Sequence, residues 1–289
     1  MSTSSSTIDI RIVRVVGEAR EAREDALAVE EPLEIRLVWG TPSEKRQKSL
    51  SITMRTPGDD VALALGFLVA EGIVTSSGDV ADAAHCGNSV RDDGTTNIVK
   101  VTLAPQRHFD MERLERHFYT SSSCGVCGKT SLEAVRSAPH APIGLGPRVT
   151  PDIVHALPAT LQAAQAAFAR TGGLHAAGLF DAGGHLIALR EDVGRHNAVD
   201  KVVGDQLRAG ALPAHDRILL VSGRASFELV QKALMAGIAV LAAVGAPSSL
   251  AVELAKAESM TVLGFVRDGR FNVYAGEERL DEASSPSRG

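Results

Sequence analysis

The chain has 289 residues, of which 44% are hydrophobic and 22% charged, and its formal net charge is −5. This length allows one large or two modest domains, and the acidic balance gives no general electrostatic case for nucleic acid binding. No apolar run approaches the ~20 residues that cross a bilayer, so we expect no membrane segment. Three Cys are too few for a disulfide framework. The first residues are polar and rich in Ser and Thr, and they lack the basic segment followed by an apolar segment that marks a secretory signal. We therefore expect a cytoplasmic protein.

The first part of the chain predicts a small α+β domain, bounded at residues 8–120. Apolar periodicity predicts its strands, over residues 8–16, 33–39, 50–55 and 97–103. Charged or turn-forming sequence predicts non-strand segments, over residues 20–31, 41–48 and 78–93. A helix is expected to begin at Thr56-Pro57-Gly58-Asp59-Asp60 and to end near Gly72, since acidic residues suit the first turn of a helix. These elements would form a small sheet covered by a helix.

The rest of the chain, residues 121–280, predicts a second domain in which helices and strands alternate. The expected helices cover residues 158–171, 197–207, 227–236 and 248–258. The expected strands cover residues 174–180, 186–189, 217–221, 238–244, 260–266 and 271–274, with a hairpin turn over residues 181–184. Because several strands are continuous apolar runs between helices, we expect a mixed α/β fold with a mostly parallel sheet covered on both faces. The last strands could instead rejoin the first domain.

Two of the three Cys lie close together in Cys124-Gly125-Val126-Cys127-Gly128-Lys129. Such a pair serves as half a zinc site, as a dithiol redox pair or as a sulfur-carrying nucleophile. A structural zinc site needs four ligands, and the only other Cys is Cys86. The surrounding Gly and Ser let the backbone bend and expose the sulfur, and Lys129 near a helix start favours a thiolate. We therefore favour a reactive thiol over a metal site, and a metal site over two buried Cys.

Residues 191–201, Glu-Asp-Val-Gly-Arg-His-Asn-Ala-Val-Asp-Lys, are dense in functional groups and open a helix just after a strand. Arg195 and His196 lie where backbone N–H groups would face an anion. The alternative is a capped, solvated helix start in which Asp192 is the cap and both Asp200 and Lys201 are exposed. These residues alone support the two interpretations about equally.

Two further strand-to-helix turns are rich in Gly and Ser: Ser222-Gly223-Arg224-Ala225-Ser226 and Gly245-Ala246-Pro247-Ser248-Ser249. In an open parallel sheet, ligands bind at the carboxyl ends of the strands, where Gly allows close approach and Arg can pair with phosphate. Each turn alone would be an ordinary turn with a Ser cap, but several on one edge favour a phosphorylated or nucleotide-like ligand. His175 begins a strand after a Gly pair, and a lone His there is more often a core residue than a ligand.

A tight turn with two Arg follows a strand at residues 264–270. The simplest interpretation is a polar hairpin. The functional interpretation has Phe265 stacking on a ring and the Arg side chains contacting phosphate.

Taken together, these motifs resemble the FdhD family. The matching segments are Cys-Gly-Val-Cys-Gly, Thr-Gly-Gly-Leu-His, the motif of residues 191–201, Ser-Gly-Arg-Ala-Ser-Phe-Glu and Gly-Phe-Val-Arg-Asp-Gly-Arg. The resemblance implies a sulfur carrier, a sulfurtransferase that formate dehydrogenase needs for activity. Members take sulfur from a cysteine desulfurase and pass it to the molybdenum, or tungsten, of a bis(molybdopterin guanine dinucleotide) cofactor. The resemblance also implies a larger domain similar to cytidine deaminases, a three-layer α/β/α fold beside the smaller α+β domain.

Carried over by position, the resemblance implies that Cys124 holds the persulfide and that Cys127 assists it. It implies a cofactor-binding turn at Phe265, Val266, Arg267, Asp268, Gly269 and Arg270. From the residue pattern, further cofactor contacts are expected at Arg195, His196, Ser222, Gly223, Arg224 and Ser248. The expected partners are the desulfurase, the catalytic subunit of formate dehydrogenase and a second copy of the chain as a homodimer, with no metal site, nucleic acid or membrane.

Three other functions are alternatives, and the first of them is discounted. A zinc hydrolase of the deaminase type needs His-x-Glu and a Pro before the first Cys, but His85-Cys86-Gly87 lacks the Glu and Ser123 replaces the Pro. A non-catalytic cofactor chaperone would need the turns but not the thiols, so Cys124→Ala would leave it working. A dithiol oxidoreductase would lose about as much from Cys127→Ala as from Cys124→Ala.

Overall fold

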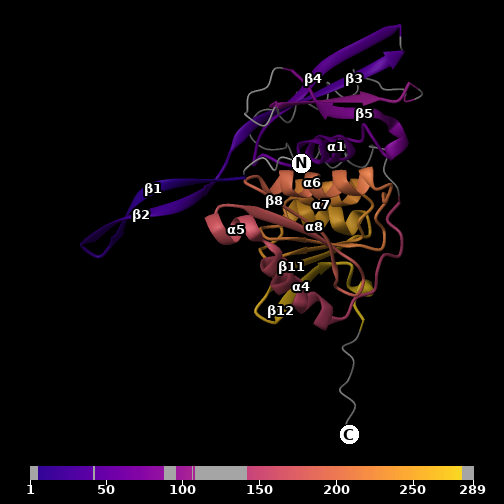
Figure 1. The fold of residues 1–289 in the computed structure, drawn as a ribbon. Coiled ribbons are helices and arrows are strands. Elements are labelled where there is room, and N and C mark those ends of the chain that lie inside the picture. The colour runs from indigo at the N-terminus through magenta and orange to yellow at the C-terminus, as the bar shows by residue number, and fades with distance from the viewer. Residues whose placement is uncertain (1–5, 42, 88–95, 106, 108–141, 282–289) are drawn as a thin grey trace.

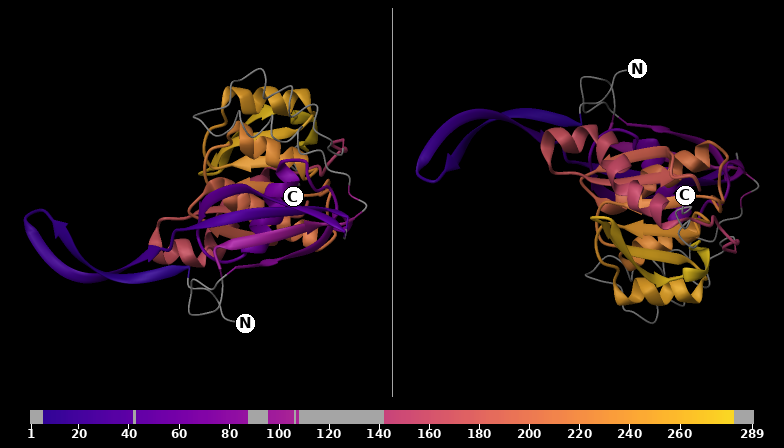
Figure 2. Two further views of the ribbon diagram at one scale, coloured as in Figure 1. Left: turned by 90° about the horizontal axis from the view of Figure 1, so that it is seen from above. Right: turned by 90° about the horizontal axis from the view of Figure 1, so that it is seen from below.

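A computed structural model describes residues 6–41, 43–87, 96–105, 107 and 142–281 of the chain (Figure 1). These residues form a two-stranded, a four-stranded and a six-stranded sheet. The four- and six-stranded sheets are stacked with helices between them, and the two-stranded sheet projects away from both as an arm (Figures 1 and 2).

The arm is an antiparallel hairpin of β1 (Thr7–Val16) and β2 (Ala19–Ala28). Strand β1 confirms the prediction for residues 8–16. The loop predicted over residues 20–31 was wrong, because most of that segment is β2. Half of the β2 residues are charged and the strand lacks apolar alternation, so its structure comes from backbone pairing with β1 rather than from a buried face.

The small domain is the sheet β4-β3-β6-β5 with α1 (Asp60–Ala70) packed against it. Its strands are β3 (Glu31–Thr41), β4 (Glu44–Arg55), β5 (Val80–His85) and β6 (Ile98–Leu103), and the 3-10 helix η1 (Ser77–Asp79) precedes β5. Leu33, Ile35 and Leu37 alternate along β3 and are fully buried in the same cluster as α1. This period of two is why β3 could be predicted.

Two predictions in the small domain were wrong. The turn predicted over residues 41–48 is shorter, because β4 begins at Glu44 and its charged first half pairs with β3. The irregular segment predicted over residues 78–93 contains β5, whose Ala- and Asp-rich sequence has little strand propensity but pairs with β6.

The larger domain is a sheet in the order β12-β11-β10-β9-β7-β8. Its strands are β7 (His175–Phe180), β8 (Leu186–Asp192), β9 (Ile218–Val221), β10 (Val240–Ala243), β11 (Thr261–Arg267) and β12 (Arg270–Ala275). All six were predicted, but the expectation of a mostly parallel sheet was wrong. Only β9, β10 and β11 run parallel, and the hairpins β7–β8 and β11–β12 add antiparallel strands on either side.

Helices cover both faces of this sheet, which confirms the three-layer α/β/α arrangement. On one face, α4 (Pro151–Ala164) shares a cluster with Ile218 and Leu220. On the other, Leu219 and Val221 meet the three helices α6 (Arg195–Arg208), α7 (Phe227–Met235) and α8 (Ser249–Ala257). The helix predicted over residues 158–171 is two helices, α4 and α5 (Ala166–Thr171), and a 3-10 helix η2 (Glu277–Arg279) follows β12.

The two domains meet where α1 packs on α6. Gly66 and Gly204 allow the helices to approach closely, since a Cβ on Gly66 would overlap the backbone oxygen of Asp200 and one on Gly204 would overlap that of Ala62. One hydrophobic cluster therefore continues from the small sheet through α1 and α6 to the large sheet.

Candidate functional site

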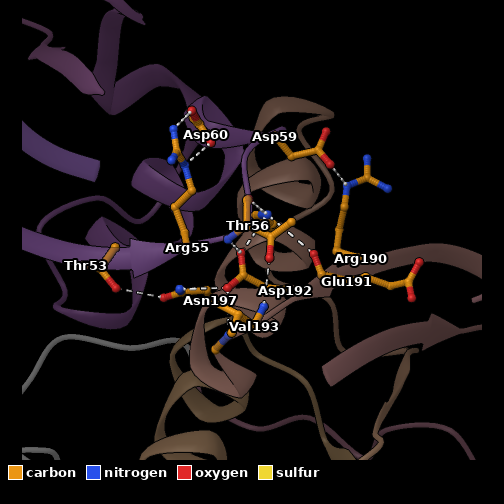
Figure 3. A network of polar contacts seen from close by, with 12 residues as sticks. Thr53, Arg55, Thr56, Asp59, Asp60, Arg190, Glu191, Asp192, Val193 and Asn197 are labelled. Carbon is orange, nitrogen blue, oxygen red and sulfur yellow. Dashed lines mark hydrogen bonds and ion pairs between the residues drawn. The ribbon is translucent and has the colours of Figure 1, made fainter. Parts of the chain in front are cut away.

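A buried polar network lies where the two domains meet (Figure 3). The Arg55 side chain is fully buried and donates two hydrogen bonds to the Asp60 carboxylate, from Nε at 2.9 Å and from Nη2 at 2.7 Å. It also donates to the backbone oxygen of Glu31 and to Oδ1 of Asn97. These bonds attach the end of β4 to the start of α1, because a buried guanidinium is tolerated only when it is paired.

Asp192, at the end of β8, connects the two domains. Its carboxylate accepts hydrogen bonds from the N–H groups of Thr56 (3.1 Å) and Gly194 (2.8 Å) and from Nδ2 of Asn197 (2.9 Å). Lys201 Nζ lies 2.7 Å from Asp192 Oδ2 and donates to the Thr56 oxygen at 2.8 Å. Asp192 is 0% exposed and Lys201 2%. This ion pair is therefore part of the protein interior.

The motif of residues 191–201 thus divides into two groups. The buried group is Asp192, Asn197, Asp200 and Lys201. The alternative in which Asp200 and Lys201 are exposed was wrong, since Asp200 pairs with Lys232 at 2.7 Å and Lys201 with Asp192. Arg195 and His196, in the first turn of α6, are only half-buried.

The second group lies at one edge of the six-stranded sheet, together with most of the other predicted residues. The carboxyl ends of β9, β10 and β11 meet there because these strands are parallel. Strand β7 runs the other way, so its first residue, His175, lies at the same edge. Strand β8 ends there at Asp192, and α6 begins beside it. Ligands of open α/β sheets bind at such an edge.

Two strand-to-helix turns are joined at this edge by backbone hydrogen bonds. The Gly245 N–H donates to the Gly223 oxygen at 2.9 Å, and the Ser248 N–H donates to the Ala225 oxygen at 3.0 Å. A Cβ on Gly245 would lie 3.0 Å from Arg224 Cγ and 3.1 Å from the Gly223 oxygen, so a larger residue here would have to push the two turns apart by a few tenths of an ångström. The structure therefore brings the two turns singled out in the sequence side by side.

The Ser hydroxyls of these turns support the fold. Ser222 Oγ accepts a hydrogen bond from the Ala176 N–H at 2.9 Å. Ser248 Oγ accepts one from the Ala251 N–H at 3.3 Å and caps α8. Each hydroxyl still has its own O–H group, so each could also donate to a ligand.

Beside the turns lies a cluster of His175, His196, Ser226 and Glu228. His196 Nε2 is 3.4 Å from Ser226 Oγ and 3.9 Å from Glu228 Oε2. The His175 ring lies against Gly223, 3.7 Å from where a Cβ would be. Sequence analysis quoted Ser226 and Glu228 only within the motif of residues 222–228 and did not name either as a site residue. The available signal was a Ser cap followed by an acidic residue, directly after Ser222-Gly223-Arg224.

Both imidazoles in this cluster are neutral at neutral pH. Burial lowers the pKa of His196 to about 4, helped by the charges of Lys232 and Arg195 and opposed by Glu228. Burial and Arg195 also lower the pKa of His175. Burial raises the pKa of Glu228, but hydrogen bonds to its carboxylate and the nearby His196 and Arg195 leave that pKa below its usual value. The positive charge at this edge therefore comes from Arg side chains.

Arg195 and Arg224 carry that charge. Neither forms an ion pair with another residue in the described part of the chain. Arg195 is also in the first turn of α6, at the positive end of the helix dipole. An anion at this edge would meet two guanidinium groups and a helix N-terminus, a combination suited to phosphate.

The end of β11, just before its turn to β12, adjoins the two hydrogen-bonded turns. The Phe265 N–H donates to the Gly245 oxygen at 3.0 Å, and Phe265 has a φ of 54°, which is uncommon for a residue other than Gly. Arg267 Cζ lies 5.8 Å from the Phe265 ring centroid, a cation–π distance. Residues 267–270 are exposed, whereas Val266 is fully buried. A ligand could meet the predicted turn except for the Val266 side chain.

The predicted catalytic residues, Cys124 and Cys127, lie outside the described residues, as does Lys129. Cys86 is half-buried in the small domain, just after β5. Within the described ranges, no group of three His, Cys, Asp or Glu side chains is placed to hold a metal ion. No helix in those ranges is long and apolar enough to span a membrane.

A cavity of about 530 Å³ lies at the other end of α6. Its lining includes Asp60 of α1, His85 of β5 and Arg208, the last residue of α6. No predicted site residue lines it, so we place the candidate site at the sheet edge.

Comparisons with known proteins cover nearly the whole chain. The model of the FdhD/NarQ family matches residues 28–281. A Streptomyces avermitilis protein named sulfur carrier protein FdhD is 51% identical over 282 residues, which cover 96% of this chain and 97% of that protein. A Mycobacterium tuberculosis protein of the same name is 52% identical over 263 residues, which cover 89% of this chain and 92% of that protein.

The fold also matches a solved structure. It is the crystal structure of a proposed formate dehydrogenase accessory protein from Desulfotalea psychrophila, with a TM-score of 0.72 and 23% identity over 96% of this chain and 100% of that chain. At this identity the match supports the fold alone. The likeness to cytidine deaminases and the domain bounds at residues 120 and 121 stay predictions.

Proposed function

Because the chain belongs to the FdhD/NarQ family, we propose that it is a sulfur carrier required for formate dehydrogenase activity. Cys124 accepts persulfide sulfur from a cysteine desulfurase. It then passes the sulfur to the molybdenum or tungsten of bis(molybdopterin guanine dinucleotide), before this substrate enters the catalytic subunit of formate dehydrogenase. The chain thus acts as a sulfurtransferase and forms a homodimer. Its low Cys content suits the reducing cytoplasm.

One observation carries the proposal. The chain is about half identical to sulfur carrier proteins over nearly its whole length, and it contains a Cys-x-x-Cys segment set in Gly and Ser. A nucleophilic thiol must be accessible and easily deprotonated, which such a segment allows.

The first transfer is a thiol exchange. The Cys124 thiolate attacks the terminal sulfur of the persulfide on the donor. A new S–S bond forms at Cys124 while the S–S bond of the donor breaks, and the donor Cys leaves as a thiolate. Lys129 would stabilise the anion that Cys124 carries before and after this step.

The sheet edge supports the second half of the proposal. A cofactor with two guanine dinucleotide tails carries several phosphates and two purine rings. Arg195 and Arg224 would bind phosphate bidentately, because no ion pair with another described residue occupies them. Phe265 would stack on a ring, and the neutral His196 would contribute a hydrogen bond rather than a charge.

Restoration of formate dehydrogenase activity in cells that lack their own sulfur carrier tests the proposal. We expect no restored activity from Cys124→Ala and full activity from the control Cys86→Ala, which changes a Cys of the small domain. Full activity from Cys124→Ala would instead support the alternative, a non-catalytic cofactor chaperone.

A further inference from the structure

Strand β5 presents an open edge beside a cavity. It is the last strand of the four-stranded sheet, and among the described residues its only strand neighbour is β6. The cavity of about 530 Å³ lies between β5, α1 and the end of α6. Its apolar lining comes from Val61, Ala62 and Leu65 of α1, Val80 and Ala83 of β5, and Leu207 of α6. An edge strand next to such a hollow is an arrangement that binds extended peptides.

The hydrogen bonds between β5 and β6 fix which backbone groups face the open edge. The Cys86 N–H donates to the oxygen of Ile98 at 3.0 Å and continues the β5–β6 register, so these residues are a hydrogen-bonded pair. Such pairs alternate with non-hydrogen-bonded pairs along an antiparallel ladder. His85, and Ala83 two residues before it, therefore fall in non-hydrogen-bonded pairs with β6. Their backbone N–H and C=O groups point away from β6, toward the open edge.

The side chains of Ala83 and His85 lie on the same side of the sheet as α1. They are opposite Val101 and Val99 of β6, which are fully buried in the cluster that contains α1, and both line the cavity. In a strand added to this edge, the two residues facing Ala83 and His85 would send their side chains to this side, into the cavity. The residue between them would face the other way. Because Ala83 carries only a methyl group, the residue opposite it has room for an apolar side chain.

The His85 end of the cavity accepts hydrogen bonds. His85 Nδ1 lies 2.8 Å from the Thr96 oxygen, which can only accept, so Nδ1 is the donor and Nε2 of the neutral ring is an acceptor. This nitrogen lies 3.6 Å from Asp60 Oδ2, which is also an acceptor. The carboxylates here are already paired with guanidinium groups, Asp60 with Arg55 and Asp59 with Arg190. A neutral group with two N–H donors, the side-chain amide of Gln, therefore fits between the two acceptors without competing with these pairs.

We propose that the edge of β5 binds an extended segment of a partner protein as an added antiparallel strand. A Gln of the segment lies opposite His85, and an apolar residue, two positions later, lies opposite Ala83. The segment therefore has the sequence Gln-x-Leu or one of the same chemistry. Backbone hydrogen bonds to Ala83 and His85 supply affinity, and the two inserted side chains supply specificity. None of this rests on the proposed sulfur transfer.

A labelled peptide, Ser-Thr-Gln-Thr-Leu-Thr-Ser, tests the pairing with the full chain by fluorescence anisotropy. Methylation of the Gln or the Leu backbone nitrogen removes an N–H that faces β5, and each should weaken binding about 10-fold. Methylation of the central Thr nitrogen is the matched control, because that N–H faces away from β5, and it should leave the affinity unchanged. Equal effects of the three methylations, or no saturable binding up to about 1 mM peptide, would overturn the proposal.

Replacement of the Gln in the peptide by Glu tests the His85 end. The carboxylate has the same shape but offers two acceptors to two acceptors, so binding should weaken about 10-fold. Equal affinity of the two peptides would show that this side chain does not meet His85 and Asp60, which would contradict the proposed register.

Two neighbouring substitutions on β5 test the cavity. Ala83→Leu fills the space that the apolar side chain of the peptide would enter, and it should weaken binding at least about 10-fold. Ala84→Leu is the matched control, because Ala84 is exposed on the opposite side of the strand, and it should bind as the parent chain does. Equal affinities of the two variants would show that the peptide does not enter the cavity. The methylated peptides use the parent chain, so their result does not depend on how either variant folds.

Sedimentation of the chain with and without the peptide tests the alternative occupant of this edge, a second copy of the chain. We expect the peptide to leave the oligomeric state unchanged. Dissociation of the assembly at peptide concentrations that saturate binding would show that β5 belongs to an interface between subunits, which would overturn the proposal of a separate partner.

Discussion

Residues 191–201 contribute to two regions that differ in one respect. At the domain junction, Asp192 and Lys201 are buried and paired with each other, and both form hydrogen bonds to Thr56 of the small domain. At the sheet edge, Arg195 is half-buried and has no ion pair with any other described residue. Both regions come from one short motif, so a density of functional groups does not itself show which residues meet a ligand. Burial and pairing separate structural charges from those available for binding.

Removing the carboxylate at the junction should have the largest effect. Asp192→Ala leaves the Lys201 charge buried without its ionic partner, which should lower the free energy of unfolding by about 3–5 kcal/mol in urea titrations. Arg195→Ala, at the edge, should change it by no more than about 0.5 kcal/mol. Equal losses from the two variants would remove the distinction between the regions.

The close approach of α1 and α6 should be the next most sensitive feature. Gly204→Ala places a Cβ where the backbone oxygen of Ala62 lies, so the helices must separate, at a cost of roughly 1–3 kcal/mol or more. Gly173→Ala is the control, because the nearest atom to its Cβ would be 3.9 Å away. If Gly204→Ala had the same free energy of unfolding as the parent chain, α1 and α6 could separate without cost, which would contradict this prediction.

At the edge, the expected effect is on binding rather than on stability. Arg195→Ala and Arg224→Ala should each weaken the binding of guanosine diphosphate, a probe for the dinucleotide tails, roughly 10- to 100-fold in calorimetry, because each removes a charge-assisted hydrogen bond. Arg208→Ala, at the other end of α6, should bind as the parent chain does. Unchanged affinity in both edge variants would place the nucleotide elsewhere.

The smallest predicted effect concerns pH. The pKa of His196 is about 4 in the folded chain against an ordinary 6.5, so between these values the unfolded chain binds more protons. The stability linked to neutral His196 is therefore present above about pH 6.5 and is lost as the pH falls toward 4. Because the side chain is 39% exposed, we discount its contribution to about 1 kcal/mol. His196→Gln should reduce the loss of stability between pH 7 and 4.5, and an identical loss would place this proton uptake on other groups.

The sequence predicted elements that depend on local patterns, and it did not predict those that depend on pairing with distant segments. Leu33, Ile35 and Leu37 have the period of a strand, and the apolar runs of β9 and β10 were equally plain. Strand β2 was missed because half of its residues are charged and only pairing with β1 makes it a strand. The antiparallel position of β7 beside β9 also depends on pairing, which no local pattern shows.

The same limit applies to the candidate site. The turns at Arg224 and Ser248 could be placed on one edge, because both follow apolar strands that alternate with helices. Burial of Lys201 could not be predicted, since its hydrogen bond to Thr56 spans 145 positions of the sequence. Glu228 was not named as a site residue, although the quoted motif contains it, because an acidic residue in the first turn of a helix is usually explained by the helix dipole alone.

The mass of the chain after incubation with a cysteine desulfurase and cysteine tests the proposed sulfur transfer most directly. We expect a gain of about 32 mass units for each sulfur atom, located on Cys124, removed by a thiol reductant and absent from Cys124→Ala. A chain that restores formate dehydrogenase activity without ever carrying this sulfur on Cys124 would contradict the proposed role as a sulfur carrier.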